Sequence, residues 1–215
     1  MCRDCGRFTK RGGWIINVLV VAAHPDDEVL GCGGTIMKHV GAGDAVKVLI
    51  MTNGRSCVPA AKAANRFMGS DVVFMGFPDQ MMDTIAFVHI VQRIEQYING
   101  IDIVYTHFRD DLNLDHRLTY QATMTACRPL PGSTIKKILC FEVLSSTEWG
   151  KGFEPNYFVE IDISDKWRAL EFYSAEMRSF PHPRSIEVVA DLANLRGATA
   201  GIPSAEAFMV ERIIC

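Results

Sequence analysis

The chain has 215 residues, the size of one α/β domain; 48% of them are hydrophobic and 22% are charged. This balance is typical of a globular protein and excludes a disordered chain. With 22 basic and 25 acidic residues, the formal net charge is −3, so no basic excess is available to bind the phosphates of nucleic acid. The longest apolar run, near residues 14–23, is about half the roughly 20 residues that a membrane helix needs. We therefore expect a soluble protein with no nucleic-acid partner and no membrane insertion.

Seven cysteines are scattered along the chain. An odd and dispersed set differs from the dense, even cysteines of a disulfide-stapled secreted domain, so we expect a cytoplasmic location. Basic residues before the apolar run resemble a signal peptide, but cleavage after Ala23 would remove the first predicted core strand. Residues 1–13 are expected to form a loose arm, in which the Cys2-x-x-Cys5 pair lacks a second pair at zinc-finger spacing. Residues 14–215 are expected to form one domain.

Strand and helix patterns alternate after the arm. Apolar runs typical of buried strands cover residues 16–23, 46–52, 72–77, 101–106, 137–143 and 157–163. Helices are predicted over residues 31–40, 60–68, 84–98, 117–127, 165–177 and 186–196. Residues 207–214 fit a strand or a helix equally well. The alternation predicts an α/β fold with a mostly parallel sheet and helices on both faces, joined by right-handed crossovers.

Two polar clusters follow the first and fourth predicted strands. Ala23-His24-Pro25-Asp26-Asp27-Glu28 follows the first strand, and the segment from His107 to Arg117 follows the fourth. In the common strand order 3-2-1-4-5 these two strands are neighbours, and ligands bind in the crevice beyond their carboxyl ends. Because chain order alone does not require this coincidence, we expect the functional site in that crevice.

His24, Asp27 and His116 are the candidate metal ligands within these clusters. Two imidazoles and one carboxylate are typical of a catalytic zinc site, which leaves one position to water. Zinc lowers the pKa of that water from about 15.7 toward 7 and polarises a carbonyl oxygen. Asp26 projects elsewhere and can accept the proton of the attacking water as general base. A plainer interpretation, carboxylates that cap the next helix, does not explain why two clusters meet. The same ligands also accept iron, cobalt or manganese.

The motif AHPDDE after an apolar strand, the segment Gly31-Cys32-Gly33-Gly34-Thr35 and the later Asp115-His116-Arg117 resemble the PIG-L/LmbE-type zinc-dependent N-acetylglucosaminyl deacetylases. The later FEVLSSTEW and MRSFPHPRS segments are similar to bacterial members. The resemblance implies a Rossmann-like fold, removal of an acetyl group from an N-acetylated sugar, and assembly as trimers or hexamers. By position, the zinc ligands are matched by His24, Asp27 and His116, the general base by Asp26, and a supporting acidic residue by Asp115.

Two positions depart from the family pattern. Asn113 stands where some members carry a histidine, and an asparagine cannot relay a proton, although it can bind substrate by hydrogen bonds. The loop after the second strand is short, and Arg55 is the nearest candidate there for a substrate-binding arginine. A short loop implies altered specificity, a more open site or an impaired enzyme.

Two further histidines are candidates for supporting roles. His182, held between two prolines, is the candidate partner of the oxyanion and donor to the leaving amine, the alternative being a surface turn. His107 ends the fourth strand and is expected to support the ligands or merely to close the strand.

Three functions stay open. The first is a zinc-dependent hydrolase that removes the N-acetyl group from an N-acetylglucosamine-type sugar or conjugate. The second is a zinc amidase acting on another acylated amine, such as an antibiotic or a thiol-sugar intermediate. The third is a non-catalytic module that binds a sugar or a nucleotide, although the carboxylate cluster would repel phosphates. The G-x-G-G spacing of residues 31–34 differs from a dinucleotide fingerprint and favours close helix packing.

Overall fold

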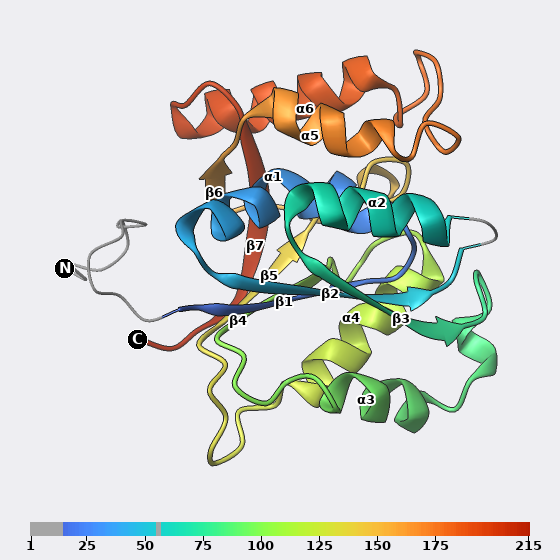
Figure 1. The fold of residues 1–215 in the computed structure, drawn as a ribbon, viewed down its shortest axis with the longest axis vertical. Coiled ribbons are helices and arrows are strands. Elements are labelled where there is room, and N and C mark those ends of the chain that lie inside the picture. The colour runs from blue at the N-terminus through green and yellow to red at the C-terminus, as the bar shows by residue number, and fades with distance from the viewer. Residues whose placement is uncertain (1–14, 55–56) are drawn as a thin grey trace.

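The computed structural model describes residues 15–54 and 57–215. The predicted arm, its Cys2 and Cys5, and Arg55 lie outside the described residues. A seven-stranded sheet with the order β3-β2-β1-β4-β5-β7-β6 forms the centre of the molecule (Figure 1). Its strands are β1 (Asn17–Ala22), β2 (Ala45–Thr52), β3 (Asp71–Phe77), β4 (Ile103–His107), β5 (Lys137–Phe141), β6 (Tyr157–Glu160) and β7 (Ala205–Ile213).

The first five strands pair in parallel, which confirms the predicted α/β class and the order 3-2-1-4-5. The segment that fitted either a strand or a helix is the strand β7. It lies between β5 and β6 and runs antiparallel to both. The final strand in chain order is therefore an interior strand of the sheet.

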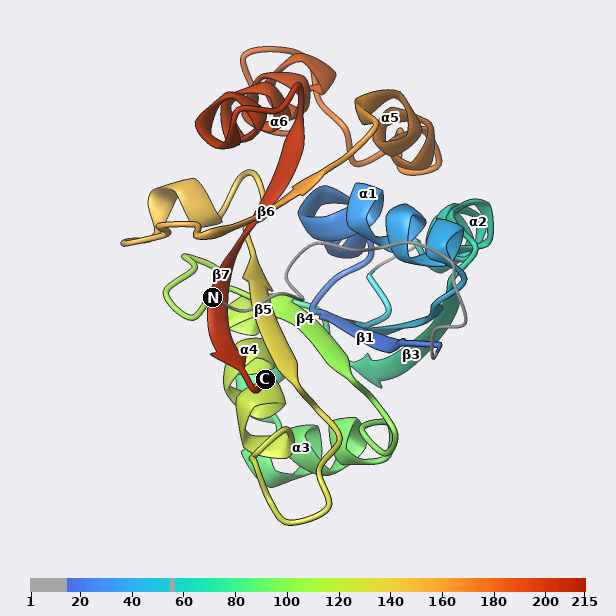
Figure 2. The same cartoon turned by 90° about the vertical axis from the view of Figure 1, so that its left-hand side faces the viewer.

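Helices cover both faces of the sheet (Figures 1 and 2). One face carries α1 (Asp27–Ala42), α2 (Val58–Met68), α5 (Ile163–Glu171) and α6 (Ile186–Ala200), and the other carries α3 (Phe87–Glu95) and α4 (Leu114–Ala126). Short 3₁₀ turns occupy Met82–Thr84 and Thr147–Trp149. Within the described residues, no helix has the length and apolarity needed to cross a bilayer.

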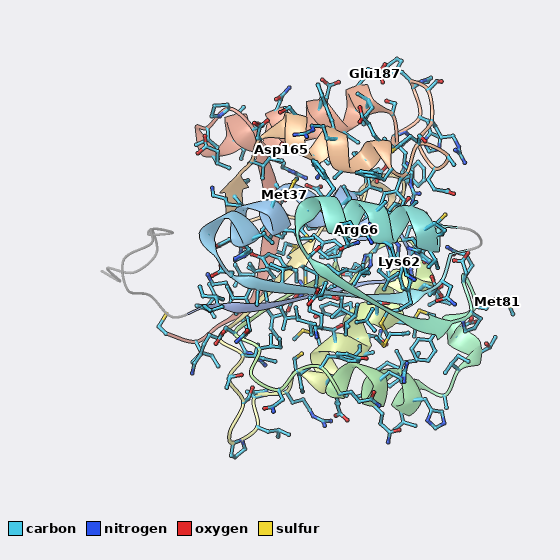
Figure 3. All side chains as sticks on the ribbon, in the orientation of Figure 1. Met37, Lys62, Arg66, Met81, Asp165 and Glu187 are labelled. Atoms are coloured by element: carbon cyan, nitrogen blue, oxygen red, sulfur yellow. The ribbon has the colours of Figure 1, made fainter. Side chains whose placement is uncertain are left out.

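Alternate side chains of the central strands enter two hydrophobic cores. Val18 and Val20 of β1 pack in the core beneath α1, whereas Leu19 and Val21 pack in the core above α3 and α4. Strands buried on both faces need continuous apolar runs, which is why the sequence pattern located them well. Polar side chains such as those of Lys62, Arg66 and Glu187 lie exposed on the outer helix surfaces (Figure 3).

Helix α1 differs most from its prediction. It begins at Asp27, four residues earlier than expected, and it is broken at Cys32, where φ is −150° and ψ is 25°. A Cβ atom on Gly34 would lie 2.7 Å from the side chain of Ile161, and one on Gly31 would overlap the ring of Phe141. The expected packing role of the glycine segment is therefore confirmed.

Other helix boundaries shift by up to six residues. Helix α3 begins at Phe87 because a 3₁₀ turn (Met82–Thr84) and the extended residue Ile85 precede it, and α5 ends at Glu171 rather than at residue 177. Helix α6 continues to Ala200, where Gly201 at a φ of 73° closes it. A left-handed glycine is the usual C-terminal stop of a helix.

Candidate metal centre

The two predicted polar clusters meet at the carboxyl edge of the sheet. β1 and β4 are hydrogen-bonded neighbours, so the turn that follows β1 lies beside the loop that follows β4. Asn113 is the N-cap of α4: its side-chain oxygen accepts hydrogen bonds from the backbone N–H of Asp115 at 2.8 Å and of His116 at 3.4 Å. This cap fixes the first turn of α4 and with it His116.

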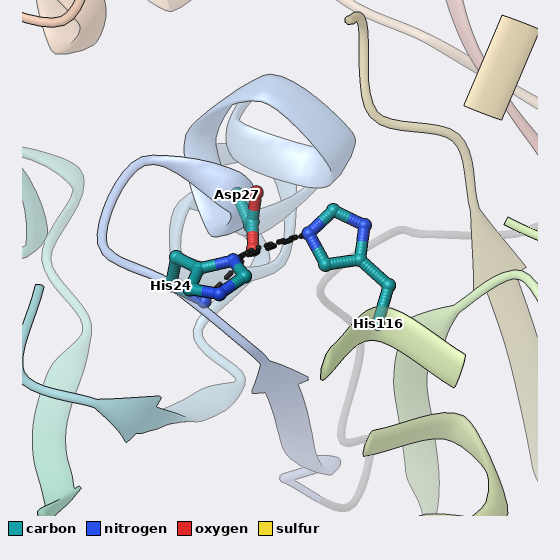
Figure 4. A group of neighbouring side chains, drawn as sticks. All are labelled: His24, Asp27 and His116. Carbon is teal, nitrogen blue, oxygen red and sulfur yellow. Dashed lines mark hydrogen bonds and ion pairs between the residues drawn. The ribbon is translucent and has the colours of Figure 1, made fainter. Parts of the chain in front are cut away.

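Three buried atoms converge at this point (Figure 4). His24 Nδ1 lies 3.2 Å from Asp27 Oδ2 and 3.2 Å from His116 Nε2. The distance from His116 Nε2 to Asp27 Oδ2 is 3.3 Å. Two imidazole nitrogens and one carboxylate oxygen thus face a common point, although His24 and His116 are far apart in the chain.

Each imidazole has a carboxylate on its far nitrogen. His24 Nε2 lies 3.2 Å from Asp115 Oδ2, and His116 Nδ1 lies 3.2 Å from Asp111 Oδ1. A carboxylate that accepts the N–H of one ring nitrogen leaves the lone pair of the other nitrogen for a metal. The donor set therefore fits a divalent ion such as zinc, and Asp27 Oδ1, buried without a hydrogen-bond partner among the described residues, supplies a further acceptor.

The electrostatics of the cluster favour a positive charge. Burial lowers the pKa of His24, but hydrogen bonds to Asp115 and Asp27 outweigh this effect and raise it to about 10. The pKa of His116 is also raised, because Asp27 and Asp111 outweigh burial. Burial opposes ionisation of Asp27, yet the neighbouring histidines hold its pKa well below the ordinary value. A field that stabilises an imidazolium would also stabilise a bound cation.

Asp26 has an unusual backbone and an incompletely paired side chain. Its φ of 101° is in the left-handed region, and its N–H donates to Glu28 Oε2 at 3.1 Å. The residue is 2% exposed, and its Oδ1 lacks a hydrogen-bond partner within the described part of the chain. Burial raises the pKa of this carboxyl well above the ordinary value. Strained backbone and unpaired buried carboxylates concentrate at functional sites.

Arg184 is a site residue that the sequence analysis did not single out. Its Nη1 donates to Asp26 Oδ2 at 2.6 Å, and its Nε donates to Ser145 Oγ at 2.8 Å. It belongs to the PHPRS segment, in which His182 was the predicted site residue. His182 is exposed, and its Nδ1 accepts the N–H of Arg184 at 3.0 Å. Its proposed catalytic role stays a prediction.

Glu28 and His107 brace the loop of residues 24–28, which we call the HPDDE loop. Glu28 Oε1 accepts hydrogen bonds from Tyr173 Oη at 2.6 Å and from Asn65 Nδ2 at 3.0 Å. Burial raises the pKa of Glu28 to about 7. His107 accepts the N–H of Ala23 at 2.8 Å through Nε2, and its ring stacks on His116 at 3.9 Å. This contact agrees with the expectation that His107 supports a ligand.

A polar cavity of about 360 Å³ opens beside the cluster. Asn113 lies at this cavity and donates from Nδ2 to Gln80 Oε1 at 3.3 Å. The lining residues are His24, Pro25, Asp26, Gly54, Cys57, Asp79, Gln80, Asn113, Glu176, Arg178 and Arg184. A substrate in this cavity would therefore meet both the candidate ligand His24 and the candidate base Asp26.

The fold and this cluster agree with the family that the sequence indicates. The chain belongs to the PIG-L family, described as GlcNAc-PI de-N-acetylase, whose profile matches residues 19–127 and so contains both polar clusters. It is a member of the PIG-L/LmbE deacetylases with a histidine–aspartate group that could hold a metal ion.

The relatives include a curated protein and several solved structures. The uncharacterized deacetylase YaiS of Escherichia coli (strain K12) is 29% identical over 159 residues, which cover 67% of this chain and 81% of YaiS. GalB, the 4-carboxy-2-hydroxymuconate hydratase of Pseudomonas putida KT2440, has a TM-score of 0.77 at 21% identity, covering 94% of this chain and 98% of GalB. The N,N'-diacetylchitobiose deacetylase of Pyrococcus horikoshii has a TM-score of 0.73 at 18% identity, covering 91% and 84%. At these identities the two structures show a shared fold.

Proposed function

We propose that the protein is a zinc-dependent hydrolase that removes the N-acetyl group from an N-acetylglucosamine-type sugar or sugar conjugate. The observation that carries this proposal is the convergence of His24, Asp27 and His116 beside an incompletely paired, buried Asp26. A divalent ion held by these three residues would supply Lewis acidity toward the amide carbonyl and toward a water molecule.

Asp26 has the position and the free atom required of a general base. Arg184 and Asp26 Oδ2 form a charge-assisted hydrogen bond, so Oδ1 is the atom left to accept a proton from the attacking water. The water oxygen adds to the acetamide carbon, and the carbon–nitrogen bond then breaks. Return of the proton from Asp26 to the leaving nitrogen gives the free amine and acetate.

The cavity lining suits a substrate rich in hydroxyl groups. Gln80, Asn113 and Arg178 offer hydrogen-bond donors, and Asp79 and Glu176 offer acceptors. The Pyrococcus horikoshii neighbour is named for an acetylated disaccharide, which supports a sugar substrate. A cytoplasmic location, expected from the scattered cysteines, and a trimeric or hexameric assembly, implied by the family resemblance, are further parts of this proposal.

An acylated antibiotic is the second candidate substrate class. Two structural neighbours are named as deacetylases of the A40926 pseudoaglycone and of the teicoplanin pathway. They have TM-scores of 0.65 and 0.71 at 17% and 16% identity. The open form of the cavity is compatible with a large conjugate, and the catalytic residues would be the same.

The test measures acetate release from N-acetylglucosamine derivatives, with metal content determined on the same samples. We expect zinc-dependent turnover that falls about 1,000-fold in Asp26→Asn while the bound metal is retained. Bound metal without acetate release, together with hydration of 4-carboxy-2-hydroxymuconate, would move the protein to the chemistry for which GalB is named. A chain that binds no metal after zinc is supplied would contradict the proposal and favour a binding module.

A further inference from the structure

A buried ion pair that takes no part in the proposed chemistry packs against the break in α1, the helix that follows the HPDDE loop. Lys166 of α5 is 5% exposed and Glu206 of β7 is 4% exposed. Lys166 Nζ lies 2.8 Å from Glu206 Oε1. Both residues lie outside the segment that the family profile matches.

The pair occupies the break in α1. In an unbroken helix the carbonyl of Leu30 would accept the N–H of Gly34. Here Leu30 O accepts Lys166 Nζ at 2.7 Å instead, and Gly34 N donates to Glu206 Oε1 at 2.9 Å. Thr35 also donates to Glu206 Oε2, from its backbone N at 2.7 Å and from its Oγ1 at 2.6 Å.

Each charge thus caps one half of the broken helix. The carboxylate of Glu206 accepts the N–H groups of Gly34 and Thr35, which the break deprives of intrahelical partners, and the ammonium of Lys166 donates to the carbonyl of Leu30 at the end of the first half. Apolar replacements of similar volume often stabilise a protein when they remove a buried ion pair. Apolar side chains could not make these four hydrogen bonds, however. The two charged residues are therefore needed to satisfy the polar groups at the break in α1.

The first half of α1 is the part that carries the HPDDE loop. It is about one turn long, and its Val29 and Leu30 N–H groups donate to the carbonyl of Asp26 at 3.0 and 2.9 Å. A single helical turn is not stable by itself. We infer that the Lys166–Glu206 pair is a positioning device, which fixes this turn and thereby the backbone of Asp26 and Asp27. This inference rests on the proposed function in one respect only, the assignment of Asp27 as a metal ligand.

The test uses the full chain with the double substitution Lys166→Met and Glu206→Gln. Because both charges disappear, no uncompensated charge stays buried, and we expect the hydrogen bonds lost at the break to lower Tm by about 5–10 °C. Amide hydrogen exchange of residues 26–31 in the metal-free protein is expected to accelerate at least about tenfold. Zinc affinity, measured by chelator competition, is expected to fall about tenfold.

The matched control is the double substitution Arg196→Met and Glu142→Gln. This pair has a contact of 2.6 Å and joins α6 to the residue after β5. It is expected to change neither exchange at residues 26–31 nor zinc affinity. The milder variant Thr35→Val removes one hydrogen bond to Glu206 and should accelerate the same exchange by a smaller factor, which keeps the test decisive if the double variant does not fold.

Unchanged exchange and unchanged zinc affinity in the double variant would overturn the inference. If the double variant does not fold, unchanged exchange in Thr35→Val would overturn it. A wild-type chain that binds no zinc would instead contradict the proposed function. In that case the exchange rates of the metal-free proteins still decide whether the ion pair positions the HPDDE loop.

Discussion

At the scale of single residues, Asp26 has a conformation that costs stability. The φ of Asp26 is 101°. A non-glycine residue in such a sparsely populated backbone region lowers the free energy of unfolding by about 1–3 kcal/mol. Glu28 compensates in part by accepting the Asp26 N–H. The carboxylate is also buried, with one oxygen on Arg184 and the other without a hydrogen-bond partner in the described structure. These properties are those of a residue placed for chemistry.

Substitution of Asp26 should therefore separate stability from activity. We expect Asp26→Gly to raise the free energy of unfolding by about 1 kcal/mol, because glycine adopts a positive φ without strain. The same change should abolish acetate release. Thermal unfolding of the two proteins, each with its metal content matched, checks the first expectation. A lower Tm in the glycine variant would show that the contacts of the Asp26 carboxylate stabilise the fold by more than the strain of its backbone destabilises it.

Arg184 should be needed for turnover and not for metal binding. We expect Arg184→Ala to lower kcat about 100-fold, because Asp26 loses the partner that orients it. Guanidinium ions added to the assay should restore part of the lost rate. Arg168→Ala is the control, since this exposed side chain of α5 does not line the cavity and pairs with Asp165 at 3.2 Å. Loss of zinc from Arg184→Ala would refute the assignment.

At the scale of elements, Asn113 shows how a residue can have a role that its position in a motif does not reveal. The sequence offered it as a substrate-binding residue in a place where relatives carry histidine. In the structure it caps α4 and faces Gln80 at the cavity. The cap holds the turn that carries both Asp115 and His116. A substitution at this position therefore affects the helix before it affects a substrate.

The cap can be tested by two substitutions. Asn113→Ala should lower the free energy of unfolding by about 1 kcal/mol, because two N–H groups of α4 lose their acceptor. Asn113→Asp keeps a side-chain oxygen at the cap and should stay within a few tenths of a kcal/mol of the wild type. Urea unfolding monitored by circular dichroism measures both. Equal stability of all three proteins would contradict the capping role.

The elements and residues that the sequence predicts well are those with local signals. The parallel strands follow from runs of Val, Ile and Leu, and the clusters after β1 and β4 follow from the strand order. Glu206 and Arg184 were missed because their contacts join residues 172 and 158 positions apart and leave no periodic pattern. The break at Cys32 was missed for the same reason, since its caps come from α5 and β7.

At the scale of the whole molecule, buried groups make folding depend on pH. His39 of α1 lies between Asp44, at 2.8 Å from Nδ1, and Tyr105 of β4, at 3.0 Å from Nε2. Burial lowers the pKa of His39 below its ordinary value of 6.5, although Asp44 opposes this effect. The folded protein therefore binds a proton at His39 less readily than the unfolded chain does. The contribution of His39 to folding stability is therefore fully present at pH values above its pKa in the unfolded chain, and it is lost as the pH falls below that pKa.

This linkage predicts a difference between the wild type and His39→Gln. From pH 7 to pH 5, the Tm of the wild type should fall more steeply than that of the variant, because only the wild type has to keep this imidazole neutral. Other titrating groups contribute equally to both proteins, so the difference reports on His39. Parallel curves over this pH range would show that His39 accepts its proton in the folded state.

The interior position of β7 has a consequence for how the molecule is made. N-terminal parts of a chain leave the ribosome first and begin to fold there. The strands β1 to β5 and both polar clusters therefore emerge well before Glu206, the second residue of β7. Until that strand enters between β5 and β6, the break in α1 lacks one of its caps. The residues proposed to hold the metal are thus among the first to be synthesised, and their loop is among the last parts of the molecule to mature.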